Sequence, residues 1–261
     1  MALDSVLLEI ADLSLSFGGV MALRNLSLRI PRGVFASIIG PNGAGKTSLL
    51  NCINGHYHPQ RGRVSLENQD ITRSRPHQIA GMGVSRTFQK IELFSHMSVL
   101  DNVKLGRHFL MKASPVSCFF RLPGMVREEF RHRRELDDEV IDFLGLSAFR
   151  NHIVGALPHG IRKRVDLARA LAMKPKLLLL DEILAGMSME EKEDMASYLM
   201  DIHRDWETTM IWIEHDLAAV MELSTWVTVL NFGEKIAEGT PVEVQKNPAV
   251  IEAYLGTGTE I

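Results

Sequence analysis

The segment at residues 40–47 (GPNGAGKT) constrains the fold of this chain most. It has the spacing of a phosphate-binding loop, which is Gly, four residues, Gly, Lys and then Ser or Thr. Residues 34–39 before it are apolar and predict a buried strand, and residues 47–53 after it predict the first turns of a helix. A phosphate loop requires this order of strand, turn and helix. The alternative, a glycine-rich turn with an incidental lysine, is disfavoured by both flanking elements.

Each part of this loop has an expected task. Gly43 and Gly45 leave backbone N–H groups free to face phosphate oxygens at a helix N-terminus, where the helix dipole favours anions. Lys46 supplies a positive charge for the β- and γ-phosphates, and Thr47 offers a hydroxyl to Mg²⁺. The residues expected to bind nucleotide through this loop are Asn42, Gly43, Ala44, Gly45, Lys46, Thr47 and Ser48.

Length and composition exclude several classes of protein. A chain of 261 residues can form one α/β domain with a subdomain, or two small domains. Its net charge of -3 argues against an unassisted nucleic-acid binder, which usually has a strong basic excess. No apolar run is long enough to cross a membrane. The two cysteines, Cys52 and Cys118, lack the spacing of a metal site, and we expect reduced thiols in a cytosolic protein.

The order of predicted elements indicates an α/β fold with an insertion. Alternating apolar residues predict antiparallel N-terminal strands at residues 7–17 and 23–30, with short strands at 64–66 and 84–87. Residues 99–150 are helix-like, and spacing places Leu136, Val140, Ile141 and Leu144 on one helical face. After residue 160 helices and strands alternate. This order predicts a mostly parallel central sheet that binds its ligand at the carboxyl ends of the strands. We expect a nucleotide-binding core at residues 1–92 and 161–261, and an inserted helical subdomain at 93–160. The later predicted strands are 177–180, 210–213, 227–231 and 235–237, and the predicted helices are 161–172, 190–206 and 216–223.

A second motif, LLLLDE at residues 177–182, complements the phosphate loop. The apolar run predicts a buried parallel strand that carries Asp181 to the edge of the sheet, where it can hold Mg²⁺ through water. Glu182 follows and could polarise the attacking water. The alternative is that both are ordinary acids at the start of a helix. Their place after a phosphate loop favours the catalytic interpretation.

Several further motifs occur in a fixed order along the chain: Phe17, TFQ ending at Gln89, LPHGI at residues 157–161, AGMS at 185–188, and IEHD with His215. With the two motifs above, nearly the whole chain resembles the ATP-binding subunit of an ABC transporter. The resemblance implies ATP and Mg²⁺ as cofactors. It implies that Phe17 stacks on adenine, that Gln89 reaches toward Mg²⁺ and senses the membrane subunit, and that His215 contacts the γ-phosphate.

The resemblance also implies a second ATPase subunit. In this family two subunits enclose ATP, and the signature motif of one subunit completes the site of the other. Here the signature residues are Pro158, His159 and Gly160, and residues 185–188 are expected to touch the dimer mate. The partner ATPase would be a paralogue or a second copy of the chain. Transmembrane permease subunits would transmit the energy, which places the chain at the cytoplasmic face of the cell membrane.

The subfamily is suggested by local sequence. FGGVMAL, GVSRTFQ, the long insertion after Gln89, the signature that contains proline, and the closing AYLG are similar to the importer branch for branched-chain amino acids and related small amides. Lipopolysaccharide-export ATPases are similar near both ends, but their helical region is shorter. Within the insertion, residues 93–110 carry Phe94, Met97 and Phe109 and could form a groove for a helix of the permease. Subdomain core is the alternative for these residues.

The chain departs from the family pattern at the signature. Pro158 stands where a serine is usual, His159 replaces a glycine and Ile161 a glutamine. Proline has no hydroxyl to donate to the γ-phosphate of the partner's ATP, although the Gly160 N–H can still donate. Ile183 and Ser188 also replace the usual Pro and Asp or Asn. These changes predict weak self-association and slow hydrolysis in the isolated subunit.

Two other functions compete with transport. A non-transport ABC ATPase of translation or DNA repair usually has two cassettes, a coiled coil or zinc cysteines, and the sequence contains none of these. A regulatory module that binds nucleotide without hydrolysis is disfavoured by Glu182 and His215.

Overall fold

The computed structural model describes residues 6–107 and 138–255. Its central sheet has the strand order β10-β9-β3-β8-β7-β6. Neighbouring strands are parallel, except for the antiparallel hairpin of β9 and β10. The predicted mostly parallel sheet is therefore confirmed. Its strands are β3 (Phe35–Ile39), β6 (Val84–Arg86), β7 (Leu177–Asp181), β8 (Thr209–Ile213), β9 (Trp226–Asn231) and β10 (Glu234–Gly239).

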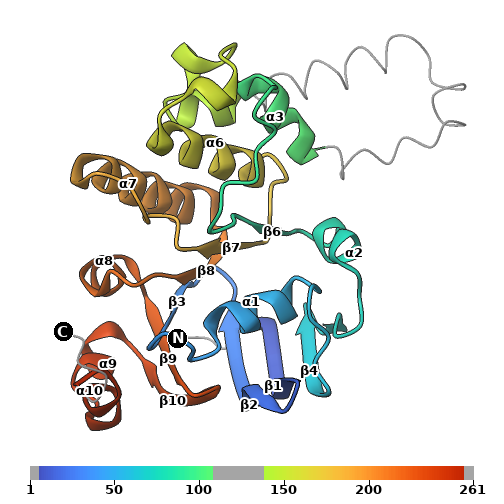
Figure 1. The fold of residues 1–261 in the computed structure, drawn as a ribbon, viewed down its shortest axis with the longest axis vertical. Helices are drawn as coiled ribbons and strands as arrows, with labels where there is room; N and C mark the ends of the chain where they lie inside the picture. The colour runs from blue at the N-terminus through green and yellow to red at the C-terminus, as the bar shows by residue number, and fades with distance from the viewer. Residues whose placement is uncertain (1–5, 108–137, 256–261) are drawn as a thin grey trace, which may run out of the picture.

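A second sheet is antiparallel and comes mainly from the N-terminal part of the chain, as predicted. Its order is β2-β1-β4-β5. The long strands β1 and β2 form a hairpin whose last pair joins Phe17 to Val20 across the Gly18-Gly19 turn. Figure 1 shows this sheet at one end of the molecule and helices α3 and α6 at the other. The strands are β1 (Val6–Phe17), β2 (Val20–Pro31), β4 (Arg61–Leu66) and β5 (Gln69–Asp70).

The helices include most of those predicted and several short ones that were not. The short helices α2, α9 and α10 were missed. For α9 the signal was present, because Thr240 and Glu243 form a capping box around a first-turn proline. The helices are α1 (Lys46–Ile53), α2 (Pro76–Gly81), α3 (Val99–Arg107), α6 (His159–Leu171), α7 (Met189–Trp206), α8 (Leu217–Leu223), α9 (Pro241–Gln245) and α10 (Pro248–Leu255).

The residues of strand β7 do not alternate between apolar and polar, because both faces of this strand are buried. Leu177 and Leu179 pack into a core shared with α1 and the antiparallel sheet. Leu178 and Leu180 point to the opposite face, into a core shared with α3, α6 and α7. Both faces of the central sheet are thus covered, and a strand in its middle must be apolar at every position.

The helical segment packs onto the second of these cores. Val140, Ile141 and Leu144 are buried, as the helical spacing predicted, together with Val99 and Val103 of α3. Leu136 and Phe109 lie outside the described residues. The division of the chain at residues 92/93 and 160/161 remains a prediction, and its second boundary falls within α6. Over residues 6–107 and 138–255, every helix is too short or too polar to span a bilayer.

Candidate functional site

The phosphate loop connects β3 to α1 through backbone conformations that only glycine adopts easily. Gly40 has a φ of 146° and Gly45 a φ of 100°. A Cβ atom at Gly40 would collide with the carbonyl oxygen of Leu230, and one at Gly45 would lie 2.5 Å from the carbonyl oxygen of Ala22. The loop is therefore fixed between β9 on one side and β2 on the other.

Lys46 is buried at the centre of this loop. Its Nζ donates hydrogen bonds to the carbonyl oxygens of Gly40 (2.6 Å) and Pro41 (3.1 Å). Burial lowers the pKa of the ammonium group, while the nearby carboxylates of Glu182 and Asp181 act to raise it. The other loop residues range from exposed to buried. Asn42, Gly43 and Thr47 are exposed, Gly45 and Ser48 are half-buried, and Ala44 is buried.

Asp181 lies at the carboxyl end of β7 and is buried against Arg86 of β6. The Arg86 Nη2 donates to Asp181 Oδ2 (2.7 Å), and its Nη1 donates to Asn51 Oδ1 on α1 (2.6 Å). The sequence analysis missed Arg86. The signal was a charged residue at the end of a short predicted strand. Asp181 Oδ1 is also buried, but it has no hydrogen-bond partner among the described residues. One carboxylate oxygen is thus occupied and the other is available.

Glu182 is held by two of the other predicted site residues. Gln89 Nε2 donates to Glu182 Oε2 (2.6 Å), and His215 Nε2 lies 2.9 Å from Glu182 Oε1. These residues follow β6, β7 and β8, which are neighbours in the sheet. The Glu182 backbone has a φ of 49°. A non-glycine residue in this region stores strain of order 1 kcal/mol, and such residues cluster at active sites.

Two buried charged residues that the sequence analysis missed support this cluster. Lys163 of α6 donates to the carbonyl oxygens of Glu182 (3.1 Å) and Gln89 (3.4 Å). Glu214 accepts hydrogen bonds from the backbone N–H groups of Leu184 (2.7 Å) and His215 (3.3 Å). Burial lowers the pKa of Lys163 and raises the pKa of Glu214.

The expected magnesium ligands fit that ion. The Thr47 hydroxyl, the Gln89 amide and the Asp181 carboxylate offer oxygen atoms, which Mg²⁺ prefers. The unpartnered Oδ1 of Asp181 is a free acceptor for a metal-bound water. In the part of the chain that the structure describes, no group of three His, Cys, Asp or Glu side chains could hold a metal. This suits an ion that takes most of its remaining ligands from phosphates and water.

The remaining predicted residues lie elsewhere. Phe17, at the end of β1, has 47% of its surface exposed. Pro158 is the N-cap of α6, His159 is its first residue, and α6 lies apart from α1 (Figure 1). His159 Nε2 is 3.3 Å from the carbonyl oxygen of Ala185, and Gly160 lies against Glu191. The structure thus brings together Lys46, Asp181, Glu182, Gln89 and His215, and leaves the signature away from this chain's own phosphate loop.

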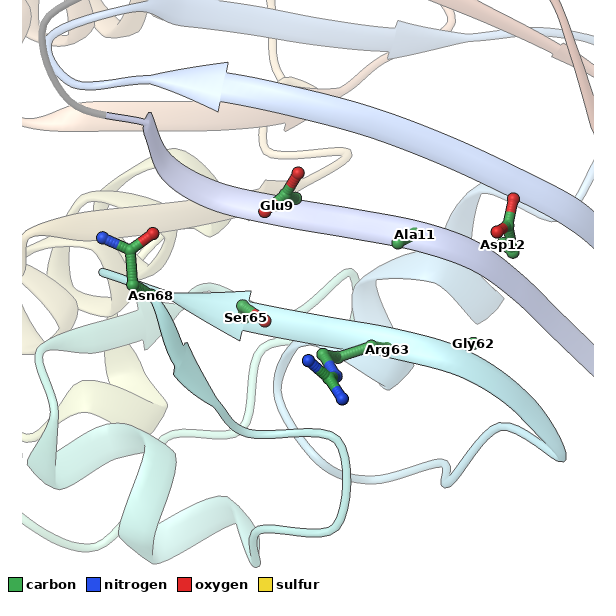
Figure 2. Close-up of a pocket in the computed structure, with 7 residues that line it drawn as sticks. All are labelled: Glu9, Ala11, Asp12, Gly62, Arg63, Ser65 and Asn68. Carbon is green, nitrogen blue, oxygen red and sulfur yellow. The ribbon is translucent and has the colours of Figure 1, made fainter.

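A hollow of about 580 Å³ on the antiparallel sheet is a different feature (Figure 2). It lies between β1 and β4, and its lining includes Glu9 and Arg63 but none of the predicted site residues. Glu9 is paired with Arg29 (2.7 Å) and Arg63 with Asp70 (3.2 Å). The charges around this hollow already have partners, so they do not call for a ligand.

Comparison with known sequences identifies the family. Residues 23–185 match the family described as ABC transporter, and residues 234–260 match a segment described as branched-chain amino acid ATP-binding cassette transporter. BraF of Pseudomonas aeruginosa, a high-affinity branched-chain amino acid transport ATP-binding protein, is 35% identical over 96% of this chain and 98% of its own length. LivG of Salmonella typhimurium, of the same description, is 36% identical over 96% and 98%.

Solved structures agree with this assignment. A nucleotide-free ATP-binding cassette of an ABC transporter is 31% identical, with a TM-score of 0.81, over 96% of this chain and 99% of that one. The ADP conformation of such a cassette is 31% identical, with a TM-score of 0.81, over 97% and 99%. A dimeric cassette bound to ADP and phosphate is 25% identical, with a TM-score of 0.75, over 90% and 98%. The chain therefore belongs to the ABC transporter family, as one of its ATP-binding, ATP-hydrolysing subunits.

Proposed function

We propose that this subunit drives an importer of branched-chain amino acids or related small amides from the cytoplasmic face of the cell membrane. One observation supports ATP hydrolysis by this subunit. Five predicted site residues lie close together at the ends of adjoining strands of the central sheet: Lys46, Asp181, Glu182, Gln89 and His215. The relatives' transport of branched-chain amino acids, over almost the full length of this chain, supports the substrate class.

In the proposed reaction, Lys46 and the N–H groups of the phosphate loop bind the phosphates of ATP. Thr47, Gln89 and Asp181 would hold Mg²⁺, which would supply positive charge to the phosphate oxygens. Glu182 accepts a proton from water as the water oxygen bonds to the γ-phosphorus, and the bond to the leaving oxygen of ADP breaks. His215 contacts the γ-phosphate. Gln89 and His215 both contact Glu182 in this structure, so their move to the nucleotide would free its carboxylate.

A second ATPase subunit completes the site in this proposal. His159 and Gly160, which follow Pro158 at the start of α6, contact the 185–191 segment of their own chain instead of the phosphate loop. They are therefore available to ATP bound by another subunit, either a paralogue or a second copy. The dimeric form of a solved relative supports such an arrangement.

The permease contact is proposed at the start of the helical insertion. Phe94 is 57% exposed and Met97 is partly exposed, whereas Phe109 lies outside the described residues. An exposed ring with polar surroundings suits a helix-in-groove contact. Cysteines at positions 94 and 97 should cross-link to the cognate permease. Transport that persists while no such pair cross-links would move the contact elsewhere.

The decisive experiment measures phosphate release and ATP affinity in parallel. The wild-type chain should release phosphate from ATP only with Mg²⁺. Lys46→Ala should lose ATP binding because the phosphates lose their main cation. Arg204→Ala, an exposed change on α7, is the control that should bind normally. Equal ATP affinity in wild type and Lys46→Ala would overturn the assignment of the loop.

Uptake of labelled leucine into vesicles that contain the cognate permeases tests the substrate. This experiment separates import from lipopolysaccharide export and from non-transport roles.

A further inference from the structure

Phe17 is not an isolated ring on the surface. It packs against Tyr57, with ring centroids 5.0 Å apart and ring planes at 70°. Both rings are well exposed, Phe17 at 47% and Tyr57 at 36%. Nearly perpendicular rings at this distance attract each other, because the edge of one ring is positive and the face of the other negative. Two adjoining exposed rings expose more apolar area than is usual unless something covers them.

The segment that carries Tyr57 is attached firmly to the strand that carries Phe17. Gln60 N donates to the carbonyl oxygen of Ser14 (3.0 Å). The Gln60 side chain also makes two hydrogen bonds with the backbone of Ser16, one from its Nε2 (3.0 Å) and one to its Oε1 (2.9 Å). The backbone N–H of Tyr57 donates to the carbonyl oxygen of Asn51 on α1 (2.9 Å). These bonds fix the two rings relative to each other and to α1.

The same elements hold the phosphate loop. Phe17 pairs with Val20 at the tip of the hairpin. Two residues further along β2, the carbonyl oxygen of Ala22 lies against Gly45 of the loop. On the other side, α1 begins at Lys46 and leads to Asn51. Both rings are therefore connected by short, hydrogen-bonded stretches to the place where the phosphates are proposed to bind.

We propose that Tyr57 is a positioning residue for the nucleotide base, and that it holds the Phe17 ring with one face free for stacking. Whichever ring supplies the edge of the pair, Tyr57 covers at most one face of Phe17, and 47% of the Phe17 surface is exposed. The inference rests on the proposed binding of ATP phosphates at Lys46. The oxygen and the nitrogen of the Gln60 side-chain amide both hydrogen-bond to the backbone of Ser16. This side chain is therefore not free to hydrogen-bond to the edge of the base. The platform recognises the flat surface of the base, and stacking of this kind discriminates little between bases.

The test compares ATP with inorganic tripolyphosphate, which has the phosphates but no base. Affinities are measured by calorimetry for wild type, Tyr57→Leu, Tyr57→Phe, Phe17→Leu and the double variant. Loss of a base-stacking ring typically weakens binding about tenfold, so Phe17→Leu should weaken ATP by that amount. Tyr57→Leu should weaken ATP about three- to tenfold, since it removes the contact that orients Phe17. Tyr57→Phe keeps the ring contact and should stay within about twofold of wild type. Phe232→Leu, which removes an exposed ring on the β9–β10 turn, is the matched control.

Three results decide the proposal. Tripolyphosphate affinity should be the same in all the ring variants, and the double variant should lose less than the product of the two single losses, because the rings act as one unit. Unchanged ATP affinity in Tyr57→Leu would overturn the role of Tyr57. An equal loss of ATP and tripolyphosphate would show that Tyr57 only supports the loop. Failure of the wild type to bind either ligand would instead reject the nucleotide function itself, and wild-type binding of both ligands with equal affinity would reject the platform alone.

Discussion

At the scale of single residues, Glu182 occupies the centre of the candidate site. Its two carboxylate oxygens contact Gln89 and His215, and its backbone carbonyl accepts a hydrogen bond from Lys163. We expect Glu182→Gln to bind ATP as wild type does, because the amide keeps the shape of the side chain. Hydrolysis should slow by about a hundredfold to ten-thousandfold, because the amide cannot accept the proton of water.

Phosphate release and ATP affinity, measured on the same preparation, check this prediction. Glu193→Gln, an exposed change on α7, should leave both unchanged. If Glu182→Gln turned over normally, the base would lie elsewhere, and His215 would be the next candidate.

Glu214 gives a prediction about pH. Burial raises the pKa of its carboxyl group, and the N–H groups of Leu184 and His215 offset this only in part. The folded protein therefore binds more protons than the unfolded chain between the unfolded pKa of about 4.3 and the raised folded value. The stabilisation from this group is complete below that window and is lost as the pH rises through it. Glu214→Gln keeps an oxygen acceptor and does not ionise, so its stability relative to wild type should increase as the pH rises above about 4.3 toward the raised folded value.

Urea unfolding of wild type and Glu214→Gln across this range provides the measurement. The exposed Glu193→Gln serves again as the control, and its difference from wild type should stay nearly constant. A stability difference for Glu214→Gln that is flat, or that falls with rising pH, would contradict the burial argument.

The residues that could be predicted from sequence are those in motifs. Lys46 and Asp181 follow from local spacing that the chemistry of phosphates demands. Arg86 and Tyr57 could not be found this way, because their partners Asp181 and Phe17 are distant in sequence and meet only through the fold. Lys163 is intermediate. It is buried on the face of α6 that also buries Gly160 and Leu167, so the helical phase would have separated it from its half-buried neighbours Arg162 and Arg164.

At the scale of elements, the starts of α6 and α7 depend on each other. Ser188 and Glu191 form a capping box at α7, in which Ser188 N donates to Glu191 Oε2 (2.9 Å). A Cβ atom at Gly160 would collide with Glu191 Oε1. We expect Gly160→Ala to push this side chain away and to weaken the cap by about 1 kcal/mol, while alanine itself favours the helix α6.

A double-mutant cycle separates these two effects. In a Glu191→Ala background the hydrogen bond from Ser188 N to the Glu191 carboxylate is already absent, so Gly160→Ala should be about 1 kcal/mol more favourable than in wild type. Urea unfolding of the four proteins measures this difference. If the effects of the two substitutions on stability were additive, the Glu191 side chain would have moved away from residue 160 while keeping its hydrogen bond to Ser188 N.

Elements followed from sequence wherever one periodic pattern extended over several residues. The strands β1 and β2 and the long helix α7 are of this kind, whereas β7 was predicted from an unbroken apolar run. The helices α2 and α9 span only six and five residues, too few for a period to emerge, and only their prolines and capping residues identify them. The pairing of β1 with β4 also could not be derived, because the connecting segment contains the entire phosphate loop.

At the scale of the whole molecule, the proposed assembly gives the subunit two half-sites that face different nucleotides. In that proposal the phosphate loop and Glu182 serve its own ATP, and the signature at the start of α6 is left for another subunit. Lys163 lies on α6, one turn after the signature, and bonds to the Glu182 carbonyl. A shift of α6 upon contact with the partner's nucleotide would therefore displace Glu182, the proposed catalytic base of this subunit's own site.

The strength of that association should depend on Pro158. This residue is the N-cap of α6, and no side-chain hydrogen bond caps the helix there. A serine hydroxyl in its place could donate to the γ-phosphate of the partner's ATP, and a charge-assisted hydrogen bond is worth about 1.5–3 kcal/mol. We therefore expect the unmodified chain to be mostly monomeric in ATP, and to prefer a paralogue as its partner.

In a Glu182→Gln background, which stops hydrolysis, Pro158→Ser should strengthen ATP-dependent dimerisation by about tenfold or more. Serine also caps a helix better than proline, so urea unfolding of the monomer must be measured separately, and Pro158→Ala controls for loss of the proline ring. Sedimentation velocity with and without ATP gives the dimer affinity. A tight ATP-dependent homodimer of the unmodified chain would show that the Gly160 N–H and its neighbours suffice, and the argument from Pro158 would then be wrong.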